Sequence, residues 1–445
     1  MNQISIGDTS GWTVLDGASI AAPYRRAAPF FNFGPGDFVK EKIEISLNGT
    51  PAQILTALGT LEKIRLRAMA YDRGEYAYSQ YLRFQTAPAT LPYYTPITEI
   101  HLVENPTGYR DRQRGSLLVE LHYTRPNWFD GEQAEVALTG RAGTDVTGGI
   151  QIVNHTDAGA FDGNTVLIKA ADASTDLPAP LRIEIQNNTA LTAWNRALVG
   201  SYHHPTYTGE DIFFGYSLDF VGGINTANPL AISGNFRTLT FTSSTFVDAF
   251  TYPIPSGEIA SLDGRTYRPV LNFFVPFAYT DLHMRLELRY STFTLHYSEA
   301  VYCDPNYQYV IFPPIQLPPN QLLRETTPQW IEIDVQGLRE GGALAQVFVD
   351  WLMLLPVESS LIFNQFIPLT GVTDKLVYDA HRELSNVRYS GTNECVSHIR
   401  QGGPLLLYPR ENTRLFFTFY NTGNVLGKDD TALVRAYYRP RISVL

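Results

Sequence analysis

Histidine is the residue type that most often binds metals or transfers protons near neutral pH. Nine histidines are scattered along the 445 residues, and one adjacent pair, His203 and His204, lies between Tyr202 and Tyr207. Adjacent side chains of an extended chain point to opposite sides, so these two imidazoles cannot easily bind one ion without a turn. The sequence predicts a surface loop at 201–207, with a ligand or interface role as the alternative, and it predicts no metal site.

The carboxylates offer a second group of candidates. Asp350 lies inside the most apolar stretch of the chain, 341–356. A buried aspartate must be paired or hydrogen-bonded, and a structural role at a strand end or bulge is far commoner than catalysis. The segments 161–164 and 428–431 could lend oxygens to calcium, but neither has the spaced pattern of a dedicated calcium loop. Hairpin turns explain both, so we expect no cofactor.

The sequence lacks the motifs of the common enzyme classes. It contains no Gly-x-Ser-x-Gly elbow, no P-loop and no dinucleotide fingerprint. A glycosidase needs two carboxylates about 5–10 Å apart in a cleft, which a sequence alone cannot supply. We therefore expect a protein without catalytic residues, and a polysaccharide-degrading enzyme is the least favoured alternative.

Aromatic side chains are the remaining candidates for binding. A ring face covers the apolar side of a pyranose, and 13% of the residues are aromatic. Trp128 and Phe129 precede a turn-like Asp-Gly pair, and Tyr202 and Tyr207 also lie in turn-like sequence. The predicted binding residues are these four aromatics with the two adjacent histidines: Trp128, Phe129, Tyr202, His203, His204 and Tyr207. Packing in a core or between subunits is the alternative for all of them.

Composition limits the class of protein. The length predicts two or three domains, and 34 Gly and 28 Pro with only 18% charged residues are typical of short strands joined by tight turns. The formal net charge of −10 argues against a nucleic-acid partner, which needs clustered basic residues. The basic segment 109–115 is interrupted by an aspartate and predicts a solvated loop.

Cysteines and apolar runs bear on the cellular compartment. With only Cys303 and Cys395, a disulfide-dense scaffold is excluded, and whether the two pair is left open. The first residues lack the pattern of a secretory signal, and no apolar run is long enough to span a bilayer. We expect synthesis in the cytoplasm, no membrane insertion, and release by assembly or lysis.

The chain before residue 90 predicts a small α+β domain. Thr50 and Gln53 form a capping box with Pro51 at the first helical position. The helix that follows should bury one apolar face and end before Gly74. Its predicted apolar face consists of Ile54, Leu58, Leu61, Ala68 and Met69. Strand alternation before and after the helix completes a domain at 1–90.

The remainder predicts a mainly β protein with two antiparallel β-sandwich domains. Short, turn-punctuated strands fill 97–204, and the same pattern continues on a larger scale in 205–445, where a jelly-roll-like sandwich is expected. The segment 341–356 begins after a Gly pair and ends at a proline. Its β-branched and aromatic residues favour a strand covered on both faces, around which the second half is built.

Four segments carry a resemblance to a known class of proteins. Residues 177–187, 349–356, 407–417 and 434–441 resemble structural proteins of tailed bacteriophages, over about the final three quarters of the chain. Residues 349–356 also resemble the last core strand of carbohydrate-binding jelly rolls. The phage resemblance implies a virion component of the tail or its accessory fibres, present in multiple copies, with no catalytic residues to carry over.

Three functions follow as hypotheses. The first is a phage virion protein, a tail or decoration or fibre subunit that assembles in the host cytoplasm with copies of itself and other virion proteins. Its loops would contact the host surface, including surface glycans. The second is a carbohydrate-binding adhesin or accessory module, and the third is a polysaccharide-degrading enzyme.

Overall fold

The computed structural model describes most of the chain, and its elements group into two compact units. Unit 1 comprises Met1–Ala134, Thr175–Pro178 and Arg439–Leu445, and unit 2 comprises Glu135–Ser174 and Ala179–Tyr438. The described residues are 3–8, 10–15, 24–26, 37–73, 75, 79–85, 91–104, 116–140, 143–154, 163–188, 193–204, 214–216, 219–232, 234–254, 265–290, 293–317, 331–381, 384–389, 392–396, 400–428 and 430–443.

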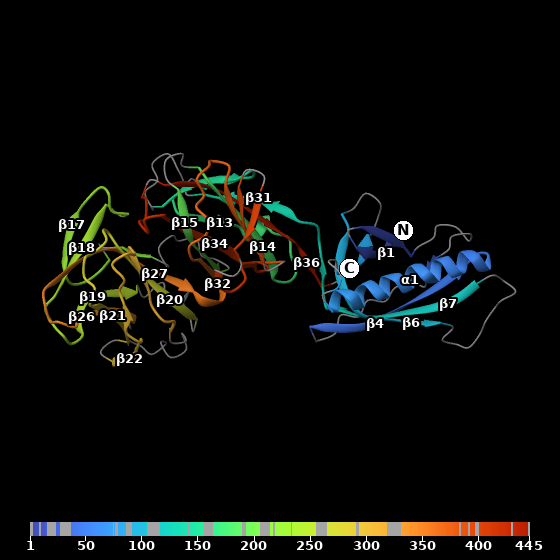
Figure 1. Ribbon diagram of the computed structural model, residues 1–445, viewed down its shortest axis with the longest axis horizontal. Helices are drawn as coiled ribbons and strands as arrows, with labels where there is room; N and C mark the ends of the chain where they lie inside the picture. The colour runs from blue at the N-terminus through green and yellow to red at the C-terminus, as the bar shows by residue number, and fades with distance from the viewer. Residues whose placement is uncertain are drawn as a thin grey trace. The chain divides into compact units, whose positions relative to one another are not determined.

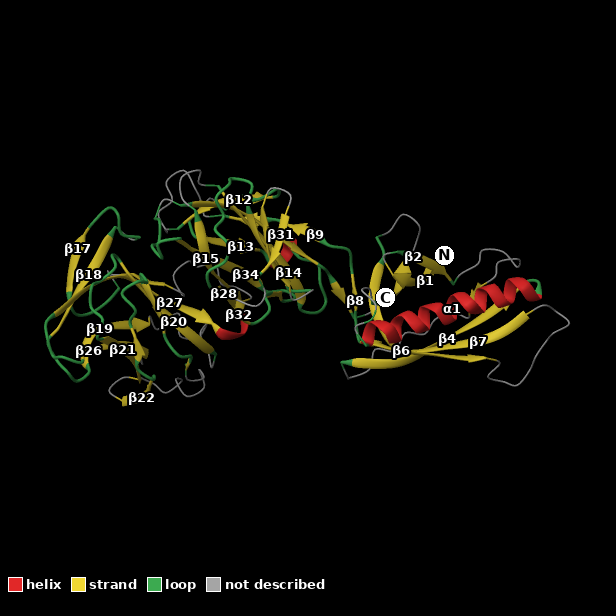
Figure 2. Ribbon diagram, in the orientation of Figure 1, coloured by secondary structure: helices red, strands yellow, loops and turns green. Residues whose placement is uncertain are grey.

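Unit 1 is one antiparallel sheet with a helix on one face. Within the described ranges the sheet has nine strands, in the order β2-β1-β5-β6-β7-β4-β3, with β8 paired to both β6 and β36. Figure 2 shows the helix, α1, lying along β4, β6 and β7. The elements are β1 (Gln3–Asp8), β2 (Gly11–Val14), β3 (Tyr24–Arg26), β4 (Phe38–Asn48), α1 (Pro51–Asp72), β5 (Gln80–Gln85), β6 (Tyr93–Glu104), β7 (Ser116–Pro126), β8 (Phe129–Asp130) and β36 (Arg441–Ile442).

The helix begins as the sequence predicts. The Thr50 side chain accepts a hydrogen bond from the Gln53 backbone at 3.3 Å, and the Gln53 side chain accepts from the Thr50 backbone at 2.8 Å, so the capping box is confirmed. The buried face is formed by Ala57, Leu61, Ile64 and Ala68, which pack on the sheet. Met69 was expected on this face but is 39% exposed, because it lies just outside the i, i+4, i+7, i+11 row that faces the sheet.

A buried ion pair lies on the sheet face that α1 covers. The Arg125 guanidinium donates to both carboxylate oxygens of Glu41, at 2.8 and 2.7 Å, and Tyr123 donates to the same carboxylate at 3.0 Å. The side chains of Arg125 and Glu41 are 0% and 2% exposed. Bidentate geometry and the added hydroxyl provide the partners that buried charges require.

The described residues of unit 2 form four antiparallel sheets. Two of them are β11-β10-β13-β34-β15-β28-β32 and β12-β35-β14-β29-β30-β31, with β33 and β9 joined to the latter. Their strands are β9 (Ala134–Val136), β10 (Leu138–Thr139), β11 (Asp145–Val146), β12 (Ile150–Val153), β13 (Thr165–Ile168), β14 (Ala179–Asn187), β15 (Trp194–His204), β28 (Ser360–Phe363), β29 (Lys375–Asp379), β30 (Leu384–Tyr389), β31 (Thr392–Cys395), β32 (Arg400–Gly402), β33 (Leu406–Leu407), β34 (Asn412–Asn421) and β35 (Thr431–Tyr438).

The other two sheets are formed from the chain between β15 and β28 (Figure 1). Their orders are β17-β18-β27-β20-β24, with β16 and β25 attached, and β19-β26-β21-β22, with β23 attached. Their strands are β16 (Phe214–Tyr216), β17 (Ile224–Ala227), β18 (Asn235–Phe241), β19 (Val247–Ile254), β20 (Thr266–Phe273), β21 (Leu282–Tyr290), β22 (Phe293–Tyr297), β23 (Val301–Tyr302), β24 (Tyr309–Ile311), β25 (Ile315–Gln316), β26 (Ile331–Arg339) and β27 (Ala345–Pro356); single turns of 3-10 helix occur at Ala170–Asp172 and Val357–Ser359.

The predicted central strand is β27. It lies inside its sheet, between β18 and β20, and every residue from 349 to 356 is buried, so the prediction of a strand covered on both faces is confirmed. One hydrophobic cluster joins Val349 and Trp351 to residues of the facing sheet and to Tyr202 and Phe416 of the preceding sheets. The turn into β27 needs Gly342, whose φ of +62° lies in the left-handed region that favours glycine.

The predicted fold class is confirmed, but the strands pair across the predicted domain boundaries. The chain is mainly β with one helix near the N-terminus. Residues 97–134, however, belong to unit 1, and β13, β14 and β15 pair with β34 and β35, more than 200 residues later, so 97–204 does not close on itself. The expected domain 205–445 is not a closed unit either, because its strands β34 and β35 pair with strands that precede residue 205. Alternation predicts that a segment is a strand, but it does not identify the strand's partner.

Candidate functional site

The structure does not expose the predicted aromatic residues of unit 1 as a pair. Phe129 is completely buried, with the Arg125 guanidinium 4.8 Å from its ring, so it has the core packing given above as the alternative to binding. Trp128 is half-buried, and the Arg441 guanidinium lies 4.7 Å from its ring centroid. The cause is local, because β8 begins at Phe129 and turns that side chain into the core.

The predicted loop at 201–207 is in part a strand. Residues 201–204 belong to β15, and Tyr202 is 1% exposed in the cluster beneath β27, so the surface loop expected there is wrong for these residues. His203 is buried too, with Nδ1 2.9 Å from Thr413 Oγ1. Burial lowers the pKa of His203 to about 3, so it is neutral and structural. The His204 side chain and Tyr207 lie outside the described residues.

Asp350 has the structural position that the sequence predicts. The pairing of β20 with β27 shifts register opposite it, which places it at a bulge. Both carboxylate oxygens lie 3.1 Å from the Ile232 backbone nitrogen, which donates to them. Burial raises the pKa of Asp350 to about 7, and the Ile232 N–H and Lys428 offset part of that rise. Of the two candidate calcium segments, Phe161, Asp162 and Asp429 lie outside the described residues.

Three carboxylates that the sequence analysis missed converge on neighbouring strands. Oxygens of Asp248, Glu287 and Asp334 lie within 4.8 Å of one another, from β19, β21 and β26. Gln336 Nε2 donates to Asp248 at 2.9 Å and to Glu287 at 2.8 Å. Arg289 Nη1 donates to Asp334 at 2.9 Å. Because the chain's own donors already occupy these oxygens, the cluster is a hydrogen-bond network rather than an open cation site.

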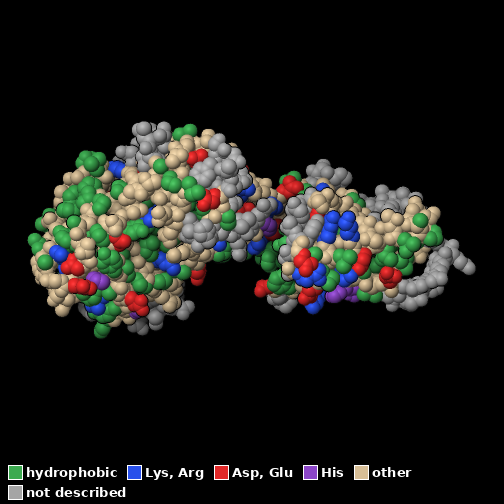
Figure 3. All heavy atoms as spheres, viewed as in Figure 1, with side chains coloured by type: hydrophobic (Ala, Val, Ile, Leu, Met, Phe, Trp, Pro, Cys, Tyr) green, Lys and Arg blue, Asp and Glu red, His purple; other side chains and the backbone are tan. Residues whose placement is uncertain are grey.

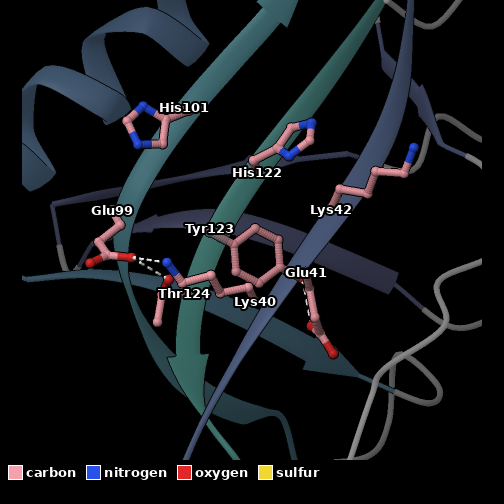
Figure 4. A pocket seen from close by; sticks show the side chains of 8 residues that line it. All are labelled: Lys40, Glu41, Lys42, Glu99, His101, His122, Tyr123 and Thr124. Carbon is pink, nitrogen blue, oxygen red and sulfur yellow. Dashed lines mark hydrogen bonds and ion pairs between the residues drawn. The ribbon is translucent and has the colours of Figure 1, made fainter.

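A polar hollow lies on the face of the unit 1 sheet opposite α1. It has a volume of about 420 Å³, and Figure 4 shows its lining side chains rising from β4, β6 and β7. His101 and His122 are direct cross-strand partners, and Lys42 is the partner of His122 on its other side. The side chains on this face are Lys40, Lys42, Glu99, His101, His122 and Thr124; Glu41 and Tyr123 also border the hollow, but their side chains belong to the face that α1 covers.

Ion pairs organise this hollow. Lys42 Nζ donates to Glu120 Oε1 at 2.7 Å, and His122 Nε2 lies 2.8 Å from Glu120 Oε2. Lys40 lies 3.3 Å from Glu99, which also accepts a hydrogen bond from Thr124 at 2.7 Å. The hydrogen bonds from Lys42 and then His122 lower the pKa of Glu120, which is therefore ionised at neutral pH. The hollow thus contains two imidazoles next to charged side chains that are held by ion pairs and hydrogen bonds.

Unit 2 carries a second candidate, an apolar edge strand. β22 is the last strand of its sheet, and all five of its residues are exposed. Phe293, Leu295 and Tyr297 are 70%, 47% and 45% exposed, and Leu295 lies at a bulge, where the pairing of β22 with β21 shifts register. Figure 3 shows that hydrophobic side chains are visible over much of the surface of this unit, mixed with polar ones.

Among the described residues, no helix is both long and apolar enough to cross a membrane.

Comparisons with known proteins give faint likenesses. No family model and no curated protein matches the sequence. Two structures of the phage P2 baseplate in its activated conformation, with Ca and with Sr, are 9% and 10% identical, with TM-scores of 0.28 and 0.24, over 100% and 98% of both chains. The infectious bursal disease virus VP2 subviral particle is 10% identical over 70% of this chain and 81% of that chain, with a TM-score of 0.16. TM-scores this low do not establish a shared fold.

Proposed function

We propose that this chain is a structural subunit of a bacteriophage particle, in the tail or as a decoration or fibre subunit. It acts by binding copies of itself and other virion proteins, and it performs no catalytic step. Assembly takes place in the host cytoplasm, and loops of the assembled protein contact the host surface. The observation that carries the proposal is the exposed apolar edge strand β22.

An edge strand of this kind needs a partner. The outer edge of a sheet offers backbone N–H and C=O groups to another strand, and proteins usually protect it with charges, proline or a covering loop. The sequence of β22, Phe-Thr-Leu-His-Tyr, has neither an acidic residue nor a proline, although its pairing with β21 shifts register at a bulge around Leu295. Covering its three large side chains would contribute on the order of 3–5 kcal/mol before the costs of association. This is the chemistry of a protein interface, where aromatic residues are enriched.

A second edge repeats the pattern on the facing sheet. β17 is fully exposed at the end of its sheet, and Val221, Ile224 and Leu230 in or beside it are 63–70% exposed. Two apolar edges on one sandwich allow a subunit to contact two neighbours, which repetitive assembly requires. The phage class itself is supported by the sequence resemblance at 177–187, 349–356, 407–417 and 434–441.

The alternative functions have less support. For a glycan-binding module, Trp128 is the one half-buried aromatic side chain among the predicted binding residues that the structure describes, and a guanidinium already lies against its ring. For a hydrolase, the converging carboxylates Asp248, Glu287 and Asp334 are occupied by internal donors. Neither observation favours these functions over assembly.

Quantitative mass spectrometry of purified particles tests the proposal. Particles released by lysis are separated on a density gradient, and peptides of this chain are quantified against those of the other particle proteins. The proposal predicts that the chain sediments with particles in several copies each, in a constant ratio to other structural proteins. Recovery only in the particle-free fractions would contradict it.

A further inference from the structure

We propose that His101 and His122 form a binding site for a divalent transition-metal ion, with Zn²⁺ as the reference ion. The site lies on the face of β6 and β7 that points away from α1. It goes beyond the proposed function, because assembly through β22 neither needs nor implies a metal in unit 1. Imidazole nitrogen suits Zn²⁺, Ni²⁺ and Cu²⁺ and does not suit Ca²⁺ or Mg²⁺.

The backbone places the two histidines side by side on adjacent strands. His101 and His122 are directly opposite each other in the antiparallel pair of β6 and β7. Cβ atoms of directly opposed residues lie about 4.5–5.5 Å apart, and Zn–N bonds are about 2.0–2.1 Å long, so two such rings can hold one ion between them. Figure 4 shows both rings on the adjacent strands that line the hollow. The neighbouring Ile100 and Leu121 are buried toward the helix, so both histidines face outward.

A bulge in β6 sets this register. The pairing of β6 with β7 shifts between Thr98 and His101, and Glu99 adopts a φ of +48° there. Positive φ is uncommon for a residue other than glycine, and bulges often re-aim a side chain beside a functional site. Without the extra residue, the side chain at position 101 would point into the core instead of lying beside His122.

Glu120 orients His122 as a metal ligand. Its Nε2 lies 2.8 Å from Glu120 Oε2, and Glu120 is held in turn by Lys42 at 2.7 Å. A carboxylate that accepts Nε2–H fixes the tautomer and leaves Nδ1 with its lone pair for a metal, the arrangement common around zinc-bound histidine. Glu120 is only 9% exposed, so its side chain is held in place beside His122. Glu120 is therefore a positioning residue and not a ligand.

His101 and the local charge balance complete the site. The His101 imidazole is exposed and makes no hydrogen bond within the described part of the chain. Around the two rings, the charges of Lys40 and Lys42 are offset by Glu99, Glu120 and Glu44, which leaves an excess of negative charge. The hollow of about 420 Å³ has room for the waters that would fill the remaining coordination positions.

Calorimetric titration of the full chain with ZnCl₂ tests the inference. A Cys395→Ser background removes the exposed thiol, which could bind Zn²⁺ independently. We expect one equivalent of Zn²⁺ to bind at pH 7.5. His101→Gln and His122→Gln should each abolish it, whereas His296→Gln, a change of an exposed histidine on β22, should leave it unchanged.

The positioning role of Glu120 is tested by a separate variant. Glu120→Gln should weaken Zn²⁺ binding about 10–100-fold, and the ¹⁵N shifts of the His122 ring should change from the Nε2–H tautomer to a mixture. Far-ultraviolet circular dichroism confirms that each variant is folded. Absence of stoichiometric Zn²⁺ binding, or full binding retained in the His101→Gln/His122→Gln double variant, would overturn the inference.

Discussion

Replacement of Asp350 by asparagine should stabilise unit 2 at alkaline pH. The carboxylate is 3% exposed on β27, and its one hydrogen-bond donor within the described residues is the Ile232 backbone N–H. Two other groups act on it electrostatically. Lys428 favours its charge at a distance while donating to the Pro229 carbonyl at 2.6 Å, and Tyr420 is a buried, neutral phenol. A charge in this position is poorly compensated.

The magnitude follows from the pKa. Burial raises the pKa of Asp350 from its ordinary value of 3.8 to about 7. Between these two values the folded chain holds a proton that the unfolded chain has released, so stability falls as pH rises through this window. The cost of ionisation is absent below about pH 4 and complete above about pH 7. A rise of this size corresponds to about 4 kcal/mol.

Differential scanning calorimetry of the wild type and Asp350→Asn at pH 5 and pH 8 measures this cost. The amide keeps an oxygen acceptor for the Ile232 N–H and carries no charge. The variant should therefore gain up to about 4 kcal/mol over the wild type at pH 8, and most of the gain should vanish at pH 5. In a unit of this size the gain raises the Tm at pH 8 by about 6 °C.

Asp281→Asn is the matched control in the same pair of sheets. The hydrogen bond from Arg339, 2.8 Å away, lowers the pKa of Asp281, so its charge stabilises the fold at pH values above its ordinary pKa. That variant should lose stability at pH 8, the opposite sign to Asp350→Asn. Equal effects of Asp350→Asn at pH 5 and pH 8, or a lower Tm at pH 8, would refute the reasoning for Asp350.

Three further outcomes follow from the structure. Arg125→Ala leaves the Glu41 charge buried without its partner and should destabilise unit 1 by about 3–5 kcal/mol in chemical unfolding; an effect below about 1 kcal/mol would show that water reaches the carboxylate. Thr50→Ala removes the side-chain cap of α1 and should cost about 1 kcal/mol in the same assay, whereas Thr50→Asp should not. Burial raises the pKa of the Cys303 thiol to about 12, so a thiol reagent at pH 8 should label the exposed Cys395 alone in the native protein and both cysteines after denaturation; two labels in the native state would contradict the burial.

Local patterns in the sequence predict the elements well. The capping box fixes the start of α1, and the apolar stretch 341–356 contains β27, because these signals depend on near neighbours. The position of Asp350 at a bulge was predictable too, since a buried aspartate needs a hydrogen-bond donor and a bulge leaves a site for one. The long-range pairing of β13–β15 with β34 and β35 has no such signal, and so the domain boundaries were misplaced.

The candidate sites were harder to predict for a related reason. Tyr202 and His203 have turn-like neighbours in sequence but belong to a strand that another sheet covers. His101 and His122 come together only through the register of two strands and a bulge between them. Polar residues at alternate positions of both segments were a usable signal of an outward face. They did not show which residues oppose each other.

The central claim is that the chain acts by assembling through the edge strand β22. The most direct measurement is the incorporation of Leu295→Lys into particles, by complementation in cells whose own copy of the gene is disrupted. Leu344→Lys is the control, since Leu344 is also exposed (62%) but lies in the turn before β27. We predict that the wild type and Leu344→Lys enter particles and that folded Leu295→Lys stays in the soluble fraction. Equal incorporation of all three, or particles that form normally without the chain, would contradict the claim.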